Sequence, residues 1–528
     1  MPVCVFVSPS RFLVSARPRI SLCLIVRNEA HQLEACLAPV VKLVDEVIVV
    51  DTGSTDATRE VAAKYATRVV SFAWCDDFSA ARNESLRHAT GDWIFWLDAD
   101  DRIDAENLAH LERLFQNLDP RSVYLMDTVC TSQDVAEGER VISHVRLFPR
   151  DARLRWQGRV HEQVRPCPST LGYELVLAPV RILHTGYADR ALLTRKLHRD
   201  IRLLRMDYAV DPHESSTLLH LGLAYARLGQ LDQAEKYFQD VLRHTTEPAD
   251  YLRRVYGTLT EMALQRGRFV QALRLTDSGL AVFPDDEYLR YLRAEVLYEL
   301  DRYQEAQVLL EQLIAQPDQR QYRGGVPADL ATRLAPRCLG EVLRIQRRHA
   351  EAVELLTRLV QSHPDDTLGW HSLGRVYIDL GDGVGLAGVR AHLARCRQGE
   401  LFSDLLLAAW EMKHHNMAEA AEVLDRVIAR APLMPLPRLM RVICLEELRA
   451  PATALASAYR DLLRLQPFHT QAAQRLQALE AALEVPARFA AGLAGTGTQA
   501  EPAVQTIQSP ARHETAQSPW SFTVVAGL

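Results

Sequence analysis

The 528-residue sequence contains no cysteine pair spaced as C-x-x-C, and its nine cysteines are scattered along the chain. This distribution argues against a structural zinc site or a disulfide framework, and it favours reduced thiols in a cytoplasm. No apolar run reaches the roughly 18 to 20 residues that a membrane-spanning helix needs. Residues 1–19 have no charge ahead of their apolar start and are interrupted at Ser8–Arg11, so we expect no signal peptide.

The chain also lacks the composition of fibrous, disordered or nucleic-acid-binding proteins. Its 25 glycines and 25 prolines are too few for a collagen-like or low-complexity chain. A net charge of −6 provides no overall basic field, so we expect no nucleic-acid partner. The content of 48% hydrophobic and 24% charged residues is typical of a folded soluble protein, and the length indicates several domains.

Residues 20 to about 185 alternate short β-rich runs with helical patterns. The apolar runs of strand length are 20–26, 47–50, 68–72 and 93–97. Strands separated by helices imply right-handed crossovers and a mostly parallel sheet, in which ligands bind beyond the carboxyl ends of the strands. Polar clusters stand at three such ends, namely Asn28–Glu29, Asp51–Asp56 and Asp98–Asp101. We therefore look for chemistry at this edge of the sheet.

From about residue 190 to 485 the pattern is helical and repeats internally. Residues 370–377 match the W-x2-L-G-x2-Y signature of the first helix of a tetratricopeptide repeat. The second-helix alanines Ala272 and Ala306 lie 34 residues apart, which is one period, whereas other spacings differ and indicate degenerate repeats. Such helix pairs bury their faces against their neighbours and form a solenoid with a concave surface. An unrelated helical array is the alternative.

These patterns predict five segments. They are an N-terminal extension at 1–18, an α/β domain at 19–190, a linker helix at 191–212, a repeat-like helical domain at 213–485 and a disordered tail at 486–528. The linker is amphipathic and basic, so we expect it to dock between the two domains, with a membrane-surface role as the alternative. The tail lacks periodicity and is rich in small and polar residues.

The run Asp98–Asp101 follows directly after an apolar strand. Crowded like charges are unfavourable unless a cation neutralises them, and ligand sets made only of oxygen atoms suit Mg²⁺ or Mn²⁺. Asp98 and Asp100 point the same way in an extended chain and are the candidate ligands. The alternative is a solvated turn in which Asp101 caps the next helix.

At the earlier strand end, Asp51 could accept hydrogen bonds from a nucleobase or ribose, although helix capping explains most of the motif Asp51–Asp56.

Four sequence blocks within residues 20 to about 190 together resemble the family 2 glycosyltransferases, which have a GT-A fold. The blocks are S-L-C-L-I-V-R-N-E at 21–29, V-V-D-T-G-S-T-D-A-T at 49–58, D-F-S-A-A-R-N at 77–83 and D-A-D-D at 98–101. The resemblance covers about a third of the chain. With the repeats behind it, the arrangement is similar to a bacterial subgroup that includes peptide-glycosylating enzymes and others that act on surface glycans.

The resemblance implies a role for each matching position. Asp51 would bind the uracil or ribose of a nucleotide sugar. Asp98 and Asp100 would form the D-x-D pair on Mn²⁺ or Mg²⁺, with Asp100 as the direct ligand and Asp98 also close to the sugar nucleotide. Arg82 and Asn83 would lie near the nucleotide, where Arg82 would support the diphosphate charge.

The segment 156–162, W-Q-G-R-V-H-E, falls where the family places a glycine loop followed by an acidic base. Family members commonly have Glu-Asp at that point. Here the favoured base is Glu162, with His161 or a purely structural pair as the alternatives. His184 follows the next expected strand and matches a histidine that completes the metal site in many GT-A enzymes, although a packed or surface role is equally open.

These features predict an inverting hexosyltransferase that uses a nucleoside-diphosphate sugar, most simply a UDP-sugar, and a divalent metal. The solenoid favours a peptide or protein acceptor and protein partners. Two alternatives are a transferase acting on a lipid-linked or cell-surface glycan and a non-catalytic repeat scaffold. We expect a cytoplasmic location, with peripheral attachment to a membrane as a further option.

Overall fold

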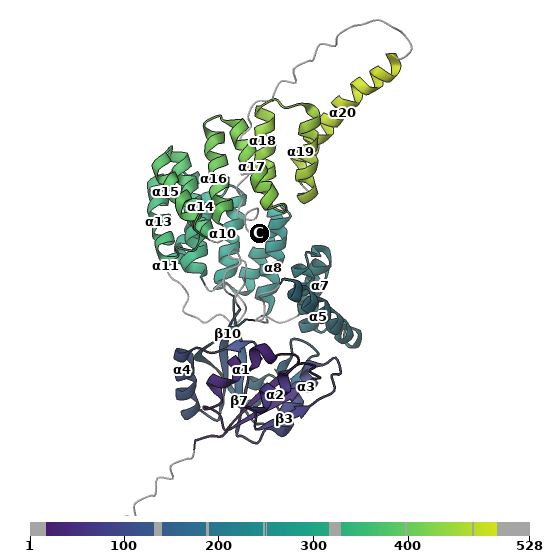
Figure 1. Cartoon of the computed structure of the whole chain (residues 1–528), viewed down its shortest axis with the longest axis vertical. Helices are drawn as coiled ribbons and strands as arrows, with labels where there is room; N and C mark the ends of the chain where they lie inside the picture. The colour runs from purple at the N-terminus through teal and green to yellow at the C-terminus, as the bar shows by residue number, and fades with distance from the viewer. Residues whose placement is uncertain are drawn as a thin grey trace, which may run out of the picture. The chain divides into compact units, whose positions relative to one another are not determined.

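The computed structural model describes residues 17–130, 140–185, 190–245, 249, 251–315, 329–396, 399–466 and 469–493. The expected N-terminal extension lies outside these residues except for 17 and 18, and the expected tail lies outside them from residue 494. The chain divides into two compact units, the first of which extends to His244 (Figure 1). No helix in the described ranges is long and apolar enough to cross a membrane.

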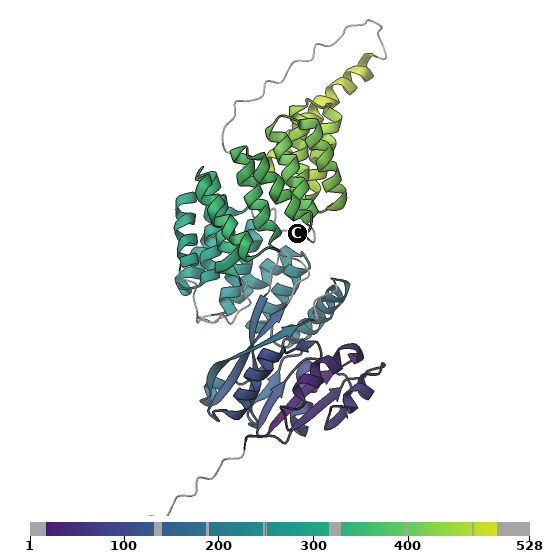
Figure 2. The same cartoon turned by 60° about the vertical axis from the view of Figure 1, so that its left-hand side comes forward.

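An eight-stranded sheet forms the base of the first unit, with the strand order β3-β2-β1-β4-β7-β6-β10-β5. Its strands are β1 (Ile20–Val26), β2 (Glu46–Asp51), β3 (Arg68–Ser71), β4 (Trp93–Trp96), β5 (Asp101–Arg102), β6 (Ser122–Cys130), β7 (Arg140–Pro149) and β10 (Glu174–His184). Strands β3, β2, β1 and β4 are parallel, and β10 is parallel to β6. Strand β7 is antiparallel to both β4 and β6, and these strands belong to the blue part of the sheet in Figure 2.

Both faces of this sheet are buried against other elements. Leu22 and Leu24 of β1 belong to one apolar cluster, whereas Cys23 between them belongs to another. The alternation follows from the strand period of two, and near-continuous apolar runs are typical of parallel strands that are covered on both faces. The intervening helices are α1 (Ala30–Val40), α2 (Thr58–Ala63), α3 (Phe78–His88) and α4 (Ala105–Gln116). The predicted α/β class with a mostly parallel GT-A-like sheet is confirmed.

The first unit continues into α5 (Arg190–Val210), α6 (Ser215–Arg227) and α7 (Leu231–His244). The first repeat-like helix pair, α6 and α7, therefore belongs to the same compact unit as the sheet, although the sequence places the start of the repeat domain at residue 213. Smaller elements of this unit are the hairpin of β8 (Arg155–Gln157) and β9 (Gln163–Arg165) and the short helix η1 (Pro168–Leu171).

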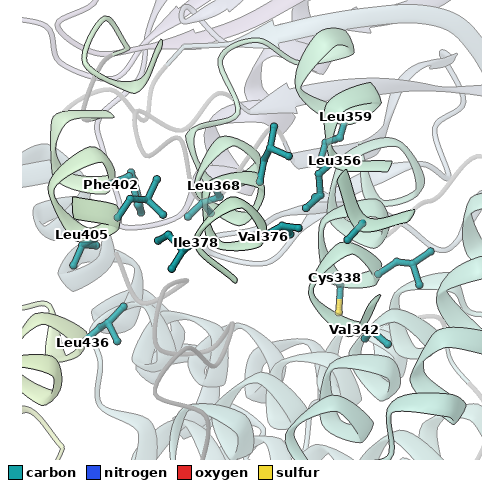
Figure 3. Packing of buried hydrophobic residues seen from close by; sticks show 14 of the residues in the cluster. Cys338, Val342, Leu356, Leu359, Leu368, Val376, Ile378, Phe402, Leu405 and Leu436 are labelled. Carbon is teal, nitrogen blue, oxygen red and sulfur yellow. The ribbon is translucent and has the colours of Figure 1, made fainter. Parts of the chain in front are cut away.

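The second unit is a run of helices stacked in pairs. Its helices are α8 (Tyr251–Gln265), α9 (Phe269–Val282), α10 (Glu287–Glu299), α11 (Tyr303–Ala315), η2 (Leu330–Leu334), α12 (Ala335–Ile345), α13 (His349–Ser362), α14 (Thr367–Leu380), α15 (Gly383–Leu393), α16 (Gly399–Lys413), α17 (Met417–Arg430), α18 (Pro435–Glu447), α19 (Ala452–Leu465) and α20 (Thr470–Leu493). One apolar core passes from α10 to α18, and Figure 3 shows part of it around Val376 and Leu405. The predicted tetratricopeptide-repeat solenoid is confirmed, and α20 extends past the expected limit at residue 485.

Glycines at the repeat positions let paired helices approach closely. A Cβ atom added at Gly222 would lie 2.6 Å from the Phe238 ring, and one added at Gly340 would lie 2.6 Å from Leu356. Both neighbours are fully buried and have no space into which to move. The repeat signature therefore reflects a steric requirement between the two helices of each pair.

We expect Gly340→Ala to lower the free energy of unfolding by about 1–3 kcal/mol, because the new methyl group overlaps the buried Leu356. Gly388→Ala in α15 is the matched control, since a Cβ at that exposed position meets nothing within 4 Å. The control should stabilise the protein by up to about 1 kcal/mol through helix propensity alone. Thermal unfolding followed by circular dichroism checks both values, and equal midpoints for the two variants would contradict the packing argument.

Candidate active site

The carboxyl ends of β1 and β2 are joined by side-chain hydrogen bonds. Asn28 follows β1 in a left-handed conformation (φ 57°), and its Oδ1 accepts a hydrogen bond from the Thr55 amide at 2.8 Å. Asp51, which is 3% exposed, accepts hydrogen bonds from the Ser54 amide and from Arg59, each at 3.1 Å. These contacts hold the Asp51 carboxylate at the sheet edge, where the sequence places it.

Four potential metal ligands meet beyond the end of β4. One ligand atom from each of Asp98, Asp100, Asp101 and His184 lies within 4.8 Å of all the others. The short strand β5 pairs antiparallel with the end of β10 and sets His184 opposite Asp101. His184 Nδ1 is 3.0 Å from Asp101 Oδ1 and 3.4 Å from Asp100 Oδ1. The structure thus brings the predicted ligand His184 to Asp98 and Asp100, which lie more than 80 residues earlier in the sequence.

Asp101 does not cap the helix that follows it, which was one of the two roles that the sequence allowed for this residue. The cap of α4 is Asp104, whose carboxylate accepts a hydrogen bond from the Asn107 amide at 2.8 Å. Asp101 is 1% exposed, accepts a hydrogen bond from the Asp98 amide and forms an ion pair with Arg146 at 2.8 Å. The capping alternative is therefore wrong, because three residues separate Asp101 from the residue that begins the helix.

Arg146 in β7 is a component of the site that sequence reasoning missed. It is 1% exposed, donates a hydrogen bond to Thr128 Oγ1 at 3.0 Å, and lies 3.9 Å from the centre of the Trp96 ring. The one available signal was an arginine between the apolar residues Val145 and Leu147 of a strand, since fully buried arginines are almost always paired. Arg146 keeps the buried carboxylate of Asp101 in place beneath the candidate metal ligands.

We expect Arg146→Met to lower the free energy of unfolding by about 3–5 kcal/mol, because the buried Asp101 carboxylate would lose its cation. Arg121→Met is the matched control. It breaks an ion pair with Asp119 at the surface, where solvent screens the charges and the pair contributes little to stability. Chemical denaturation of both variants measures the difference. Similar losses in the free energy of unfolding would show that the buried pair of Arg146 and Asp101 contributes no more to stability than the exposed pair.

Arg82 connects the acidic cluster to the candidate base. It extends from α3, which begins where the Asp77 carboxylate accepts a hydrogen bond from the Ala80 amide. One guanidinium nitrogen lies 2.9 Å from Asp98 Oδ1, and Nε lies 2.5 Å from Glu162 Oε1. The guanidinium also packs on two tryptophan rings, at 4.3 Å from the centre of Trp96 and 5.1 Å from that of Trp156. Arg82 is therefore fixed between the two carboxylates.

Burial and neighbouring charges separate the pKa values of the carboxyl groups. Burial raises the pKa of Asp98, but the guanidiniums of Arg82 and Arg146 outweigh this effect and hold it below its ordinary value. Burial raises the pKa of Glu162 as well, and Arg82 offsets only part of the rise. A raised carboxyl pKa in a site lined by charged groups is typical of a residue that accepts a proton during catalysis.

The side-chain amide of Asn83 forms hydrogen bonds with the protein backbone. Its Nδ2 donates a hydrogen bond to the Trp156 carbonyl at 2.9 Å, and its Oδ1 accepts one from the Trp156 amide at 3.0 Å. Both hydrogen-bonding ends of the side chain therefore fix strand β8. Asn83 thus positions β8 beside Arg82, and its place near the nucleotide, which the family resemblance implies, stays a prediction.

The loop from Gly158 to Glu162 joins β8 to β9 and presents the two candidate bases differently. Gly158 and His161 both have positive φ angles, of 103° and 55°. Glu162 turns towards Arg82, whereas the exposed His161 stacks on His220 of α6 at 4.1 Å between ring centres. This arrangement favours Glu162 as the base.

Comparison with known proteins agrees with the fold. Residues 21–168 match the model of glycosyl transferase family 2, and tetratricopeptide repeat models match 216–244, 263–325 and 407–470. A tetratricopeptide repeat-containing protein of Synechococcus elongatus is 34% identical over 247 residues, which are 45% of this chain and 60% of that protein. The glycosyltransferase SunS of Bacillus subtilis is 24% identical over 295 residues, which are 54% of this chain and 68% of SunS.

Two solved structures are also similar to parts of the chain. A tetratricopeptide repeat protein from Parabacteroides merdae has a TM-score of 0.40 at 13% identity and covers 48% of this chain and 93% of its own. Glucosyl-3-phosphoglycerate synthase from Mycobacterium tuberculosis has a TM-score of 0.20 at 26% identity and covers 23% of this chain and 47% of its own. The matched sequence families show that this chain carries a family 2 glycosyl transferase domain followed by tetratricopeptide repeats.

Proposed function

We propose that this protein transfers a sugar from a nucleoside-diphosphate sugar, most simply a UDP-sugar, to an acceptor with inversion at the anomeric carbon. The observation that supports this function best is the continuous set of contacts from the acidic cluster through Arg82 to Glu162. It supplies a site for a charged donor and a carboxylate for proton removal within one set of interacting side chains.

The donor atoms of the cluster suit a divalent cation. Carboxylate oxygens with one imidazole fit Mn²⁺ or Mg²⁺, and Asp98, Asp100 and His184 would hold the ion. With His184 counted as a neutral ligand and each carboxyl group as ionised, four carboxylates face two guanidiniums in direct contact, which leaves two negative charges for a cation to balance. The groups are Asp98, Asp100, Asp101, Glu162, Arg82 and Arg146. A bound divalent ion would supply Lewis-acid stabilisation of the departing diphosphate.

The protein's own residues account for the remaining requirements of transfer. Arg82 offers a fixed positive charge beside the diphosphate, and Asp51 offers a carboxylate to the uracil or ribose at the end of β2. Glu162 acts as the general base that removes the proton of the acceptor nucleophile. Attack from the side opposite the departing diphosphate gives inversion, by analogy with inverting glycoside chemistry.

The repeats favour a peptide or protein acceptor, because stacked helix pairs form an extended surface suited to a polypeptide. A lipid-linked or cell-surface glycan is the second candidate, with the repeats binding protein partners. A scaffold without activity is the third. The acidic cluster argues against the third candidate, since crowded carboxylates are costly to maintain in a site that binds no cation.

The direct test incubates the full chain with a panel of UDP-sugars and Mn²⁺ or Mg²⁺ and measures the release of UDP. We expect slow release of UDP from one donor by hydrolysis without an acceptor, and faster release by sugar transfer once a suitable acceptor is present. Thermal-shift measurements with the same panel identify the bound donor independently of turnover. If no nucleotide sugar is bound or hydrolysed with either metal, the proposed function is overturned.

A further inference from the structure

Helices α5 and α6 lie outside residues 21–168, which match the transferase family, yet they contact the loop that carries Glu162. The linker and the first repeat-like helix belong to the same compact unit as the sheet. Two side chains that contact the loop Gly158–Glu162 are Asp207 of α5 and His220 of α6.

Asp207 binds the loop at Arg159 with both carboxylate oxygens. Its Oδ2 accepts a hydrogen bond from the Arg159 amide at 3.2 Å, and its Oδ1 pairs with Arg159 Nε at 3.1 Å. On the opposite side of this residue, the Arg159 carbonyl accepts a hydrogen bond from the Phe78 amide at 2.9 Å. Arg159 is thus held between α5 and the start of α3.

Helix α5 is itself anchored on the sheet domain one to two turns before Asp207. Arg202 donates hydrogen bonds to both carboxylate oxygens of Asp76, at 2.8 and 2.7 Å. The guanidinium of Arg199 lies 4.9 Å from the centre of the Phe78 ring. A bidentate pair restricts both distance and orientation, so these contacts determine where Asp207 meets the loop.

His220 supports the other end of the loop through its ring. The rings of His161 and His220 are 4.1 Å apart and inclined by only 11°. The Nδ1–H group of His220 donates a hydrogen bond to the Ser216 carbonyl one turn earlier in α6, at 2.7 Å. This bond orients the His220 ring against the helix, and His161 packs on a surface whose orientation is already set.

We propose that Asp207 and His220 are positioning residues, which hold the Gly158–Glu162 loop so that the Glu162 carboxylate can reach the acceptor. The role in transfer rests on the proposed function. The loop needs such support, because His161 is a non-glycine residue at positive φ, and this backbone conformation persists only when its surroundings enforce it. A displacement of about 1 Å can reduce a rate roughly a hundredfold. The helices that follow the transferase domain are therefore part of its active site.

The first measurement is hydrogen–deuterium exchange of residues 158–162 in the full chain, which requires no substrate. We expect Asp207→Asn and His220→Ala to raise exchange in this segment by about tenfold or more. His220→Phe, which retains a ring for stacking, should restore most of the protection. The controls are Asp240→Asn, which removes an i,i+3 pair with Arg243, and His213→Ala, which removes a contact between two other histidine rings. Wild-type protection in both loop variants would overturn the proposal.

The second measurement is the transfer rate with the donor identified above. Asp207→Asn and His220→Ala should lower kcat about 10- to 100-fold with an unchanged donor KM, while the two control variants keep wild-type values. If the wild type is active and both loop variants have the same kcat as the wild type, the positioning role is overturned. An inactive wild type would instead overturn the proposed function, and the exchange experiment would still decide whether Asp207 and His220 hold the loop.

Discussion

Replacing Asp100 by alanine should reduce donor turnover at least about a thousandfold and leave the protein folded. The Asp100 carboxylate lies 3.4 Å from His184 in the cluster of potential ligands, and among the described residues this histidine is its ion-pair partner. Loss of the Asp100 carboxylate therefore removes no partner from a buried guanidinium. Loss of Asp98 or Asp101 would remove a carboxylate partner from Arg82 or Arg146. Calorimetry should show weaker Mn²⁺ binding, and circular dichroism should show an unchanged spectrum.

The exposed Asp119 provides a matched control for this substitution, because it pairs with Arg121 at the surface and has no contact with the cluster. Asp119→Ala should keep wild-type turnover and Mn²⁺ affinity. Chelation with EDTA should abolish wild-type turnover, and added Mn²⁺ or Mg²⁺ should restore it. Full activity in Asp100→Ala would remove this residue from the mechanism.

Replacing Glu162 by glutamine should reduce transfer by about 10²- to 10⁴-fold without weakening donor binding. The glutamine oxygen can still accept the hydrogen bond from Arg82 Nε, so the support of Arg82 is retained while the basic carboxylate is lost. Single-turnover transfer measures the chemical step, and calorimetry with the donor measures binding.

The neighbouring histidine distinguishes the two candidate bases. His161→Phe retains an aromatic ring for stacking on His220 and should leave transfer within about threefold of wild type, whereas loss of the general base would lower transfer by about a hundredfold or more. Normal transfer in Glu162→Gln together with a large loss in His161→Phe would assign the base to His161. Normal transfer in both variants would exclude this loop as the source of the base.

Local sequence patterns were sufficient for the fold class and for part of the site. The apolar runs at 20–26 and 93–97 became β1 and β4 because near-continuous apolar segments require burial on both faces of a sheet. Parallel order then places the ends of β1, β2 and β4 at one edge, which is why Asp51 and Asp98 could be assigned to it from sequence.

The antiparallel ladder of β6 and β7 was not anticipated, and neither was the role of its residue Arg146. The register pairs Thr128 with Ile142, and the fold brings Arg146 to Asp101, which is 45 positions earlier. The spacing of residues along the sequence does not predict such a contact. An arginine in a strand can face solvent or a buried partner, and only the packed sheet decides between the two.

The sequence by itself determined an α/β domain with carboxylates at one sheet edge, followed by a repeat solenoid, because hydrophobic periodicity and small-residue spacing are local properties of a chain. Only the tertiary structure decided that Asp101 pairs with a buried arginine, that Asn83 binds backbone, and that Asp207 and His220 support the loop of Glu162. Ion pairs and ring stacks of this kind join segments 40 to 80 residues apart. They form only where folding has already brought the segments together.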